Sequence, residues 1–130
     1  GLEDLLLRSV RNSGLPIVTQ LRDNTDGLAN ALAEPQKIAL FRIIQEAVNN
    51  AIKHAAPSVI IVEITASTSH LQLTILDDGR GLDPVSRLET GGIKNMQVRA
   101  QLLSAHVQID KGPSGKGTCV QISLPLPTHA

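Results

Sequence analysis

Two separated segments of this chain carry residue types that could bind a nucleotide. In the first, Glu46 and Asn50 lie four residues apart and Lys53 follows three residues later, so on a helix the three side chains share one face. Carboxylate and amide oxygens are ligands that Mg²⁺ prefers, and a lysine can neutralise a phosphate. Taken alone, this spacing favours an ordinary solvated polar face, because it is common in helices.

The second segment is a predicted strand that ends on a carboxylate. Leu71, Leu73 and Ile75 alternate along the strand, and Asp77 continues their face, so Asp77 is predicted to point inward and Asp78 outward. A buried carboxylate is costly unless it accepts a hydrogen bond, and the exocyclic amine of adenine is a suitable donor. The alternative is a plain Asp-Gly turn, and the residues alone leave both interpretations open.

Glycines follow these residues in three places. Gly79 and Gly81 permit close backbone approach to a ligand. Thr90-Gly91-Gly92-Ile93 leads into a predicted helix, whose first N–H groups could face a phosphate, although alone it favours a flexible loop before a surface helix. Gly115-Lys116-Gly117-Thr118 is not a P-loop, because GxxxxGK[ST] is not matched and a strand follows.

Hydrophobic periodicity predicts the elements that position these residues. The predicted helices span 2–13, 35–54 and 93–105, the predicted strands span 17–21, 59–66, 71–76, 107–109 and 118–124, and 22–31 and 77–92 are predicted loops. The strands 59–66 and 71–76 are expected to form an antiparallel hairpin. This order favours a layered α/β sandwich with a mixed sheet over a doubly wound parallel sheet.

The long central helix has a predicted apolar stripe. Its members step round one face at intervals of three and four residues, and the face with Glu46, Asn50 and Lys53 is expected to lie opposite. The members of the stripe are Phe41, Ile44, Val48, Ile52 and Ala55.

Composition limits the class of protein. With 130 residues the chain suits one domain, and one aromatic residue in a chain that is 42% hydrophobic predicts an aliphatic core. The net charge of +0 gives no electrostatic footprint for nucleic acid or an anionic membrane.

Cys119 is the only cysteine, so a disulfide within the chain is excluded. The longest apolar run, Val59 to Val62, is too short to span a bilayer. No secretory signal is recognised at the start, and the chain opens in a predicted helix, so a domain of a larger protein is expected.

Four segments in this order resemble the catalytic ATP-binding domain of sensor histidine kinases, in the gyrase/Hsp90/histidine kinase/MutL superfamily. Residues 41–55 (FRIIQEAVNNAIKHA) resemble the N box, 77–81 (DDGRG) match DxGxG, 92–96 resemble the second glycine box, and 115–118 match GxGT. The resemblance covers nearly the whole chain. It implies a Bergerat-type fold, a mixed and mostly antiparallel sheet with helices layered on one face. The likeness is greatest to the subfamily paired with LuxR/NarL-type response regulators, whose helix reads QEAxxNxxKHA.

The resemblance implies roles for the polar residues. Asn50 would be a Mg²⁺ ligand, and Glu46 would help to hold the metal or polarise a water molecule. Lys53 would contact phosphate, and His54 would pack near the ribose or base. Asp77 would accept the hydrogen bond from the adenine amine, which agrees with its inward phase.

It also implies roles for the glycine segments. Gly79 and Gly81 would shape the pocket, and Gly92, with Gly91 and Ile93 beside it, would border the phosphates. Thr118 would support Asp77, and residues 82–91 would form a short ATP lid. The chain departs from the family pattern at two positions, which are Asn95 in place of Gly and Val98 in place of Glu.

No histidine fits the phosphoacceptor of the family, which is followed by an acidic residue. His54, His70, His106 and His129 are followed by Ala, Leu, Val and Ala. The resemblance therefore implies that the domain donates phosphate to a histidine on a separate dimerisation domain of the same protein, and that a response regulator then receives it. The domain is expected to be cytoplasmic, attached to a membrane-anchored sensor, with no direct contact to membrane or nucleic acid.

Two alternatives remain at this point. One keeps the fold and makes it an ATP-responsive regulatory module or an anti-sigma-factor-like serine kinase, against which the short lid and the N box count. The other is an α/β domain without a nucleotide site. Asp77 discriminates between them, because its neutralisation should abolish ATP binding only where the nucleotide pocket exists.

Overall fold

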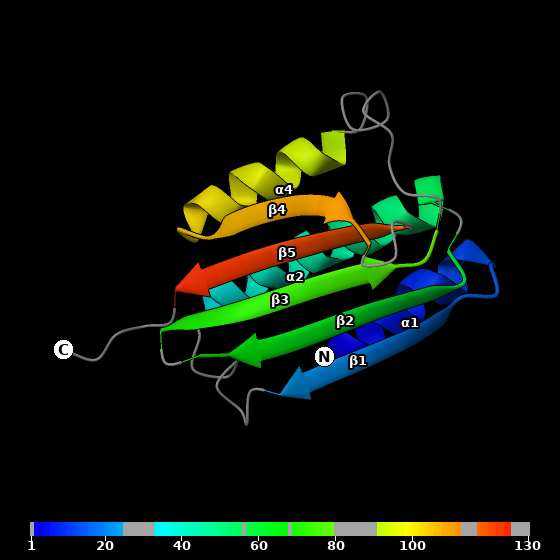
Figure 1. The fold of residues 1–130 in the computed structure, drawn as a ribbon, viewed down its shortest axis with the longest axis horizontal. Helices are drawn as coiled ribbons and strands as arrows, with labels where there is room; N and C mark the ends of the chain where they lie inside the picture. The colour runs from blue at the N-terminus through cyan, green and yellow to red at the C-terminus, as the bar shows by residue number, and fades with distance from the viewer. Residues whose placement is uncertain are drawn as a thin grey trace.

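Five strands form one mixed sheet in the order β1-β2-β3-β5-β4 (Figure 1). The computed structural model describes residues 2–24, 33–55, 57–67, 69–79, 91–112 and 117–125. β1 pairs with β2 in parallel, and the other neighbours pair antiparallel. This confirms the predicted fold class and the hairpin. The strands are β1 (Val18–Asn24), β2 (Val59–Ala66), β3 (His70–Asp77), β4 (His106–Lys111) and β5 (Thr118–Pro125).

The helices cover one face of this sheet, as Figure 1 shows. Glu34 and Pro35 open the long helix, where proline costs nothing because the first N–H groups have no helical partner. Just before it, the side chain of Gln36 accepts a hydrogen bond from the N–H of Ala33 at 2.9 Å. The helical elements are α1 (Leu2–Ser13), α2 (Glu34–Asn50), a π-helical turn η2 (Ala51–Ala55) and α4 (Gly91–Leu102).

The core lies between the sheet and the helices. Strands contribute every second residue, and α2 contributes residues at intervals of three and four, as the two backbone periods require. The described core is aliphatic apart from Met96. Its central members are Ile60, Val62 and Ile64 of β2, Leu71, Leu73 and Ile75 of β3, Val120, Ile122 and Leu124 of β5, and Leu40, Ile43, Ile44, Ala47 and Val48 of α2.

The predicted apolar stripe of the long helix is wrong at Phe41, which is 40% exposed. Ile44 and Val48 are buried as predicted, whereas Ile52 is only partly buried. The buried face of α2 includes Ile43 and Ala47 beside Ile44 and Val48, so it is rotated away from Phe41. The helix also changes from α to π geometry after Asn50.

Among the other elements, β1, α4 and β4 differ most from their predicted boundaries. β1 runs on to Asn24, because its polar residues from Arg22 onward pair with β2, so tertiary pairing overrides local polarity. α4 begins at Gly91, so both glycines lie in its first turn and not in the loop before it. It ends at Leu102 in a turn where Ser104 has φ 55°, and β4 begins and ends outside the predicted range 107–109.

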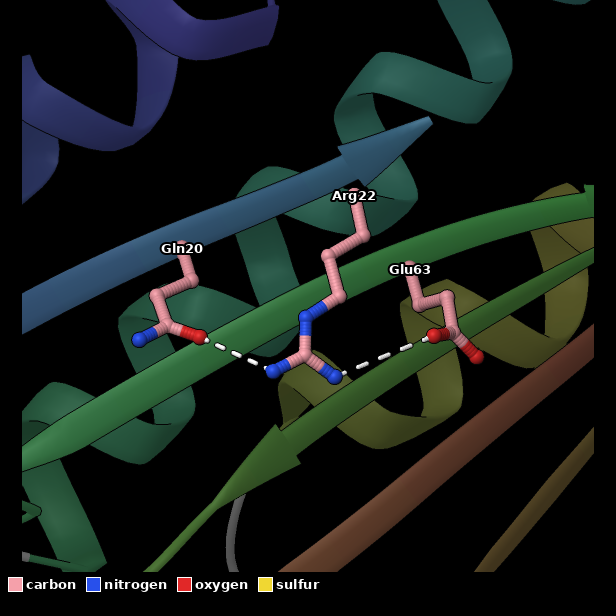
Figure 2. A network of polar contacts seen from close by, with 3 residues as sticks. All are labelled: Gln20, Arg22 and Glu63. Atoms are coloured by element: carbon pink, nitrogen blue, oxygen red, sulfur yellow. Dashed lines mark hydrogen bonds and ion pairs between the residues drawn. The ribbon is translucent and has the colours of Figure 1, made fainter. Parts of the chain in front are cut away.

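The other face of the sheet is polar and open. Figure 2 shows Arg22 of β1 between Gln20 and Glu63, with Nη2 donating to Gln20 Oε1 at 3.1 Å and Nη1 lying 4.0 Å from Glu63 Oε2. Arg22 and Glu63 are register partners on neighbouring strands. Both side chains are exposed, so this pair belongs to a solvated surface.

Among the described residues, no helix is both long enough and apolar enough to cross a membrane.

Candidate nucleotide site

The predicted site residues gather at one end of the sheet. Asp77 ends β3 and is the register partner of Thr118, which begins β5, and of Ile60 near the start of β2. The end of α2 and the turn η2 lie at this same end (Figure 1). Antiparallel pairing thus brings together residues that are far apart in the sequence.

Asp77 points into the domain, as strand alternation predicted, and is 9% exposed. Burial raises the pKa of its carboxyl, and the neighbouring charge of Asp78 raises it further. Two backbone groups oppose this: the N–H of Gly79 donates to Oδ1 at 2.9 Å, and the backbone of Thr118 also lowers the pKa. The result is a buried acceptor whose charged form is costly in this structure.

Two further polar side chains at this end are buried. Asn50 is 8% exposed and Thr118 is 5% exposed. Within the part of the chain that the structure describes, Asn50 Nδ2 and Thr118 Oγ1 have no hydrogen-bond partner. A buried polar group left unpaired costs about 1–3 kcal/mol. Such groups therefore point to a ligand or water that completes them.

Asn50 is buried because it follows Ile43 by seven residues, about two helical turns, and so lies over the core. The prediction that its face lies opposite the apolar stripe is therefore wrong for Asn50. Glu46, one turn earlier, is half-buried, and Lys53 is exposed. The three residues thus step from the core edge to solvent and do not form one uniformly solvated face.

Lys53 and His54 lie on η2 and not on a continued α-helix. A π-helical turn is rare and is frequent at functional sites, because its wider ring changes the direction of the side chains that follow. The backbone of His54 belongs to η2, and its side chain lies outside the described residues.

Gly117 has a structural role that the sequence interpretation did not assign to it. Its φ is +75°, and a Cβ on it would overlap the carbonyl oxygen of Asp77 and come 2.8 Å from the carbonyl carbon. The backbone of β3 therefore closes on Gly117 just beside the buried carboxylate. The GxGT match contains this glycine, but its contact is visible only once the two strands are paired.

Asp78 was predicted to face solvent, and it is exposed. Its Oδ1 nevertheless accepts hydrogen bonds from the N–H groups of Ser58 at 2.7 Å and Val59 at 2.9 Å. The bond from Val59 is the main cause that lowers the pKa of Asp78. No local pattern signals this contact, because its partners lie about twenty residues earlier in the chain.

Comparison with known proteins decides the family. Residues 36–128 match the family described as histidine kinase-, DNA gyrase B-, and HSP90-like ATPase. The chain belongs to this ATPase family. This confirms the predicted ATPase family, while the assignment to the subfamily paired with LuxR/NarL-type regulators stays a prediction. The matched residues include both ends of the candidate site, from Glu46 to Thr118.

The ATPase domain resembles parts of longer proteins. It is 35% identical over 128 residues to sensor histidine kinase YhcY of Bacillus subtilis, covering 97% of this chain and 33% of YhcY. It is 36% identical over 120 residues to the signal transduction histidine-protein kinase/phosphatase UhpB of Salmonella typhimurium, covering 92% of this chain and 23% of UhpB. The chain thus spans a third or less of these two relatives.

A solved structure confirms the fold of the ATPase domain. The histidine kinase domain of the Erythrobacter litoralis EL346 blue-light activated histidine kinase superposes with a TM-score of 0.79 at 22% identity, covering 96% of this chain and 59% of that one.

Some predicted site residues lie outside the described part of the ATPase domain. Gly81 is one, and so is the predicted lid apart from Gly91. Gly91, Gly92 and Ile93 form the first turn of α4, but only their backbone is described. Among the described residues there is no group of three or more His, Cys, Asp or Glu side chains that could hold a metal by itself.

Proposed function

We propose that this domain binds ATP with Mg²⁺ and donates the γ-phosphate to a histidine on a separate dimerisation domain, in two-component signal transduction. The observation that carries the proposal is the buried Asp77 carboxylate beside the Thr118 hydroxyl, which has no partner among the described residues, in a chain of the ATPase family. The names of YhcY and UhpB, both histidine kinases, support the choice of reaction.

The base side of the site consists of Asp77 and Thr118. In this proposal the exocyclic amine of adenine donates to Asp77, which supplies the missing compensation for a buried carboxylate. Thr118 Oγ1 is adjacent in register, has no partner among the described residues and bonds the base edge or a water molecule next to it. The family resemblance assigns Gly79 and Gly81 to the shape of the pocket and His54 to the ribose or base.

The metal and phosphate side consists of α2, η2 and the start of α4. In this proposal the amide oxygen of Asn50 would be a ligand of a Mg²⁺ that shares its other ligands with the phosphates. The Asn50 Nδ2, which has no partner among the described residues, would then donate to a phosphate oxygen. Glu46 lies one turn away on α2, where it would hold the metal or a water molecule. A bound Mg²⁺ supplies charge neutralisation to the phosphates. Lys53 is exposed and free to reach a phosphate as a point charge.

We assign the first turn of α4 to the phosphates. α4 and β4 are joined by a tight turn at Ser104, and twelve helical residues span about 18 Å. The N-terminal end of the helix therefore lies at the end of the sheet where Asp77 lies (Figure 1). Its first N–H groups at Gly91 and Gly92, next to Ile93, lack helical partners and favour an anion.

The acceptor histidine belongs elsewhere. His70 and His106 begin β3 and β4 at the far end of the sheet, and the seven-residue step from His70 to Asp77 corresponds to roughly 23 Å. We therefore propose that the acceptor lies on the dimerisation domain of the same kinase, on the cytoplasmic side. The likeness of residues 41–55 to QEAxxNxxKHA supports a LuxR/NarL-type response regulator as the next partner.

Calorimetric titration tests the base and metal sides separately. We expect ATP with Mg²⁺ to bind in the micromolar to millimolar range, and ITP, which lacks the exocyclic amine, to bind at least about tenfold more weakly because Asp77 stays unpaired. Asn50→Ala should remove the dependence of ATP affinity on Mg²⁺ but keep the preference for ATP over ITP. Equal affinity for ATP and ITP would reject Asp77 as the base reader. Absence of ATP binding by the folded domain would reject the proposed site.

A second assay tests the reaction. The domain, mixed with a dimerisation domain that carries the acceptor histidine, should transfer label from γ-labelled ATP to that histidine in acid-labile form. Label retained on this domain, or appearing as an acid-stable hydroxyl ester, would contradict a histidine-directed kinase.

A further inference from the structure

Asp78 joins three strands at the edge of the candidate site. Its Oδ1 accepts from the backbone of Ser58 and Val59 at 2.7 and 2.9 Å. Its own N–H donates to the carbonyl of Val59 at 3.4 Å, and the carbonyl of Ser58 accepts from the N–H of Val18 at 2.9 Å. The Asp78 carboxylate thus bonds the start of β2 directly, and the start of β1 is linked to it through Ser58.

The segment held by Asp78 is the exit from η2. Ser58 follows buried Pro57 and lies only three residues after Ala55, the last residue of η2. Three residues span at most about 11 Å even when extended, so fixing Ser58 restricts where η2 and its Lys53 can lie. Asp78 also follows Asp77 directly in the sequence. Through its side chain and its backbone it therefore connects the proposed phosphate side of the site, at η2, to the proposed base side, at Asp77.

The two neighbouring aspartates are opposed in environment. Backbone N–H groups lower the pKa of Asp78, whereas burial raises the pKa of Asp77. Asp78 thus stays charged and keeps both hydrogen bonds at neutral pH, and an asparagine there would retain the accepting oxygen without the charge. Replacing Asp78 by asparagine therefore tests the two roles separately. It keeps the hydrogen bonds to the backbone and removes the negative charge that raises the pKa of Asp77.

We propose that Asp78 is a positioning residue, which fixes η2 and its phosphate-binding face relative to the base-reading carboxylate of Asp77. This inference rests on the proposed ATP function. In the absence of the Asp78 acceptor, Asp77 keeps its bond from Gly79 and its place in the ladder of β3, while Ser58 and the end of η2 lose an anchor. The loss should therefore fall on the phosphates and spare the base.

The test compares ATP–Mg²⁺ with adenosine, which has the base but no phosphates, in binding titrations of the wild type, Asp78→Ala and Asp78→Asn. We expect Asp78→Ala to weaken ATP–Mg²⁺ by about tenfold or more, because small misplacements of a binding group are costly, and adenosine by less than about threefold. Asp78→Asn should recover ATP–Mg²⁺ affinity to within about threefold of the wild type, since an accepting oxygen remains.

Asp110→Ala is the matched control, because Asp110 is exposed on β4 and accepts a side-chain bond from Gln108 at 2.7 Å. It should change neither affinity. Equal losses of ATP and adenosine affinity in Asp78→Ala would show a merely structural role and overturn the inference, as would unchanged ATP affinity or failure of Asp78→Asn to recover. A wild type that binds neither ligand would instead refute the proposed function itself.

Discussion

The two ends of β3 treat their polar groups in opposite ways. At the His70 end, the hydroxyl of Ser67 accepts from the N–H groups of Ser69 and His70 at 3.4 and 3.1 Å, and Ser69 Oγ lies 2.8 Å from His70 Nδ1. At the Asp77 end, the carboxyl has a raised pKa, and Thr118 Oγ1 is buried with no partner among the described residues.

This contrast between the two ends of β3 distinguishes residues that serve folding from residues that serve ligand binding. At the hairpin end, the side chains of Ser67, Ser69 and His70 find hydrogen-bond partners within the turn and are exposed to water. The Asp77 end carries buried polar groups without a partner among the described residues, and under the proposed function a nucleotide completes them. Changes at the two ends should therefore affect stability and nucleotide binding in different proportions.

The largest effect is expected from Gly117→Ala. The new Cβ would overlap the Asp77 carbonyl and the residue would retain a φ of +75°, so β3 and β5 would have to separate at the site. We expect a loss of about 3 kcal/mol or more in the free energy of unfolding, measured by urea denaturation.

Gly14→Ala is the control for that change. Gly14 also has positive φ, +69°, but nothing lies within 4 Å of an added Cβ. Its substitution should cost only about 1–2 kcal/mol, the cost of a left-handed conformation. Equal losses in the two variants would mean that the close approach at Asp77 is unimportant.

Thr118→Val should separate stability from binding on a smaller scale. Valine keeps the shape of the side chain and removes the unpartnered hydroxyl, so the free energy of unfolding should be unchanged or rise by about 1 kcal/mol. ATP affinity should fall by roughly fivefold to tenfold, as the loss of one hydrogen bond predicts. Thr74→Val, on the open face of β3, is the control and should leave ATP affinity unchanged; a clear loss of stability in Thr118→Val would contradict the account.

The smallest effect is expected on the open face, from Glu63→Gln. The Arg22–Glu63 pair is exposed and 4.0 Å long, so its loss should change the free energy of unfolding by less than about 0.5 kcal/mol. ATP affinity should not change. A large change in either quantity would show that this surface is coupled to the site at the sheet end.

Local pattern predicted the burial of Asp77 correctly and the burial of Asn50 wrongly. Strand alternation placed Asp77 inward, because a strand has only two faces and three aliphatic residues identify the buried one. A helix has no such binary choice, and selecting Phe41 as a core residue rotated the predicted face away from Asn50. β1 was predicted too short because its polar residues gain their order from pairing with β2.

The contacts of Asp78 and Gly117 were not predictable from local sequence. Each joins segments that meet only in the folded sheet, Asp78 with Ser58 and Val59, and Gly117 with Asp77. Glycine and aspartate are common in any turn, so their types alone did not distinguish a structural contact from ordinary loop chemistry.

The most direct test of the central claim is to measure unfolding free energy and ATP affinity together in Asp77→Asn. Because the folded pKa of Asp77 lies above its ordinary value of 3.8, wild-type stability falls as pH rises from below that value through the folded pKa, and the variant escapes this loss. We predict that at pH 7 the variant is more stable than the wild type, that this gain vanishes at pH values where Asp77 is protonated in both states, and that ATP affinity falls by at least about tenfold. A variant that is less stable at pH 7 and still binds ATP as the wild type does would contradict the account.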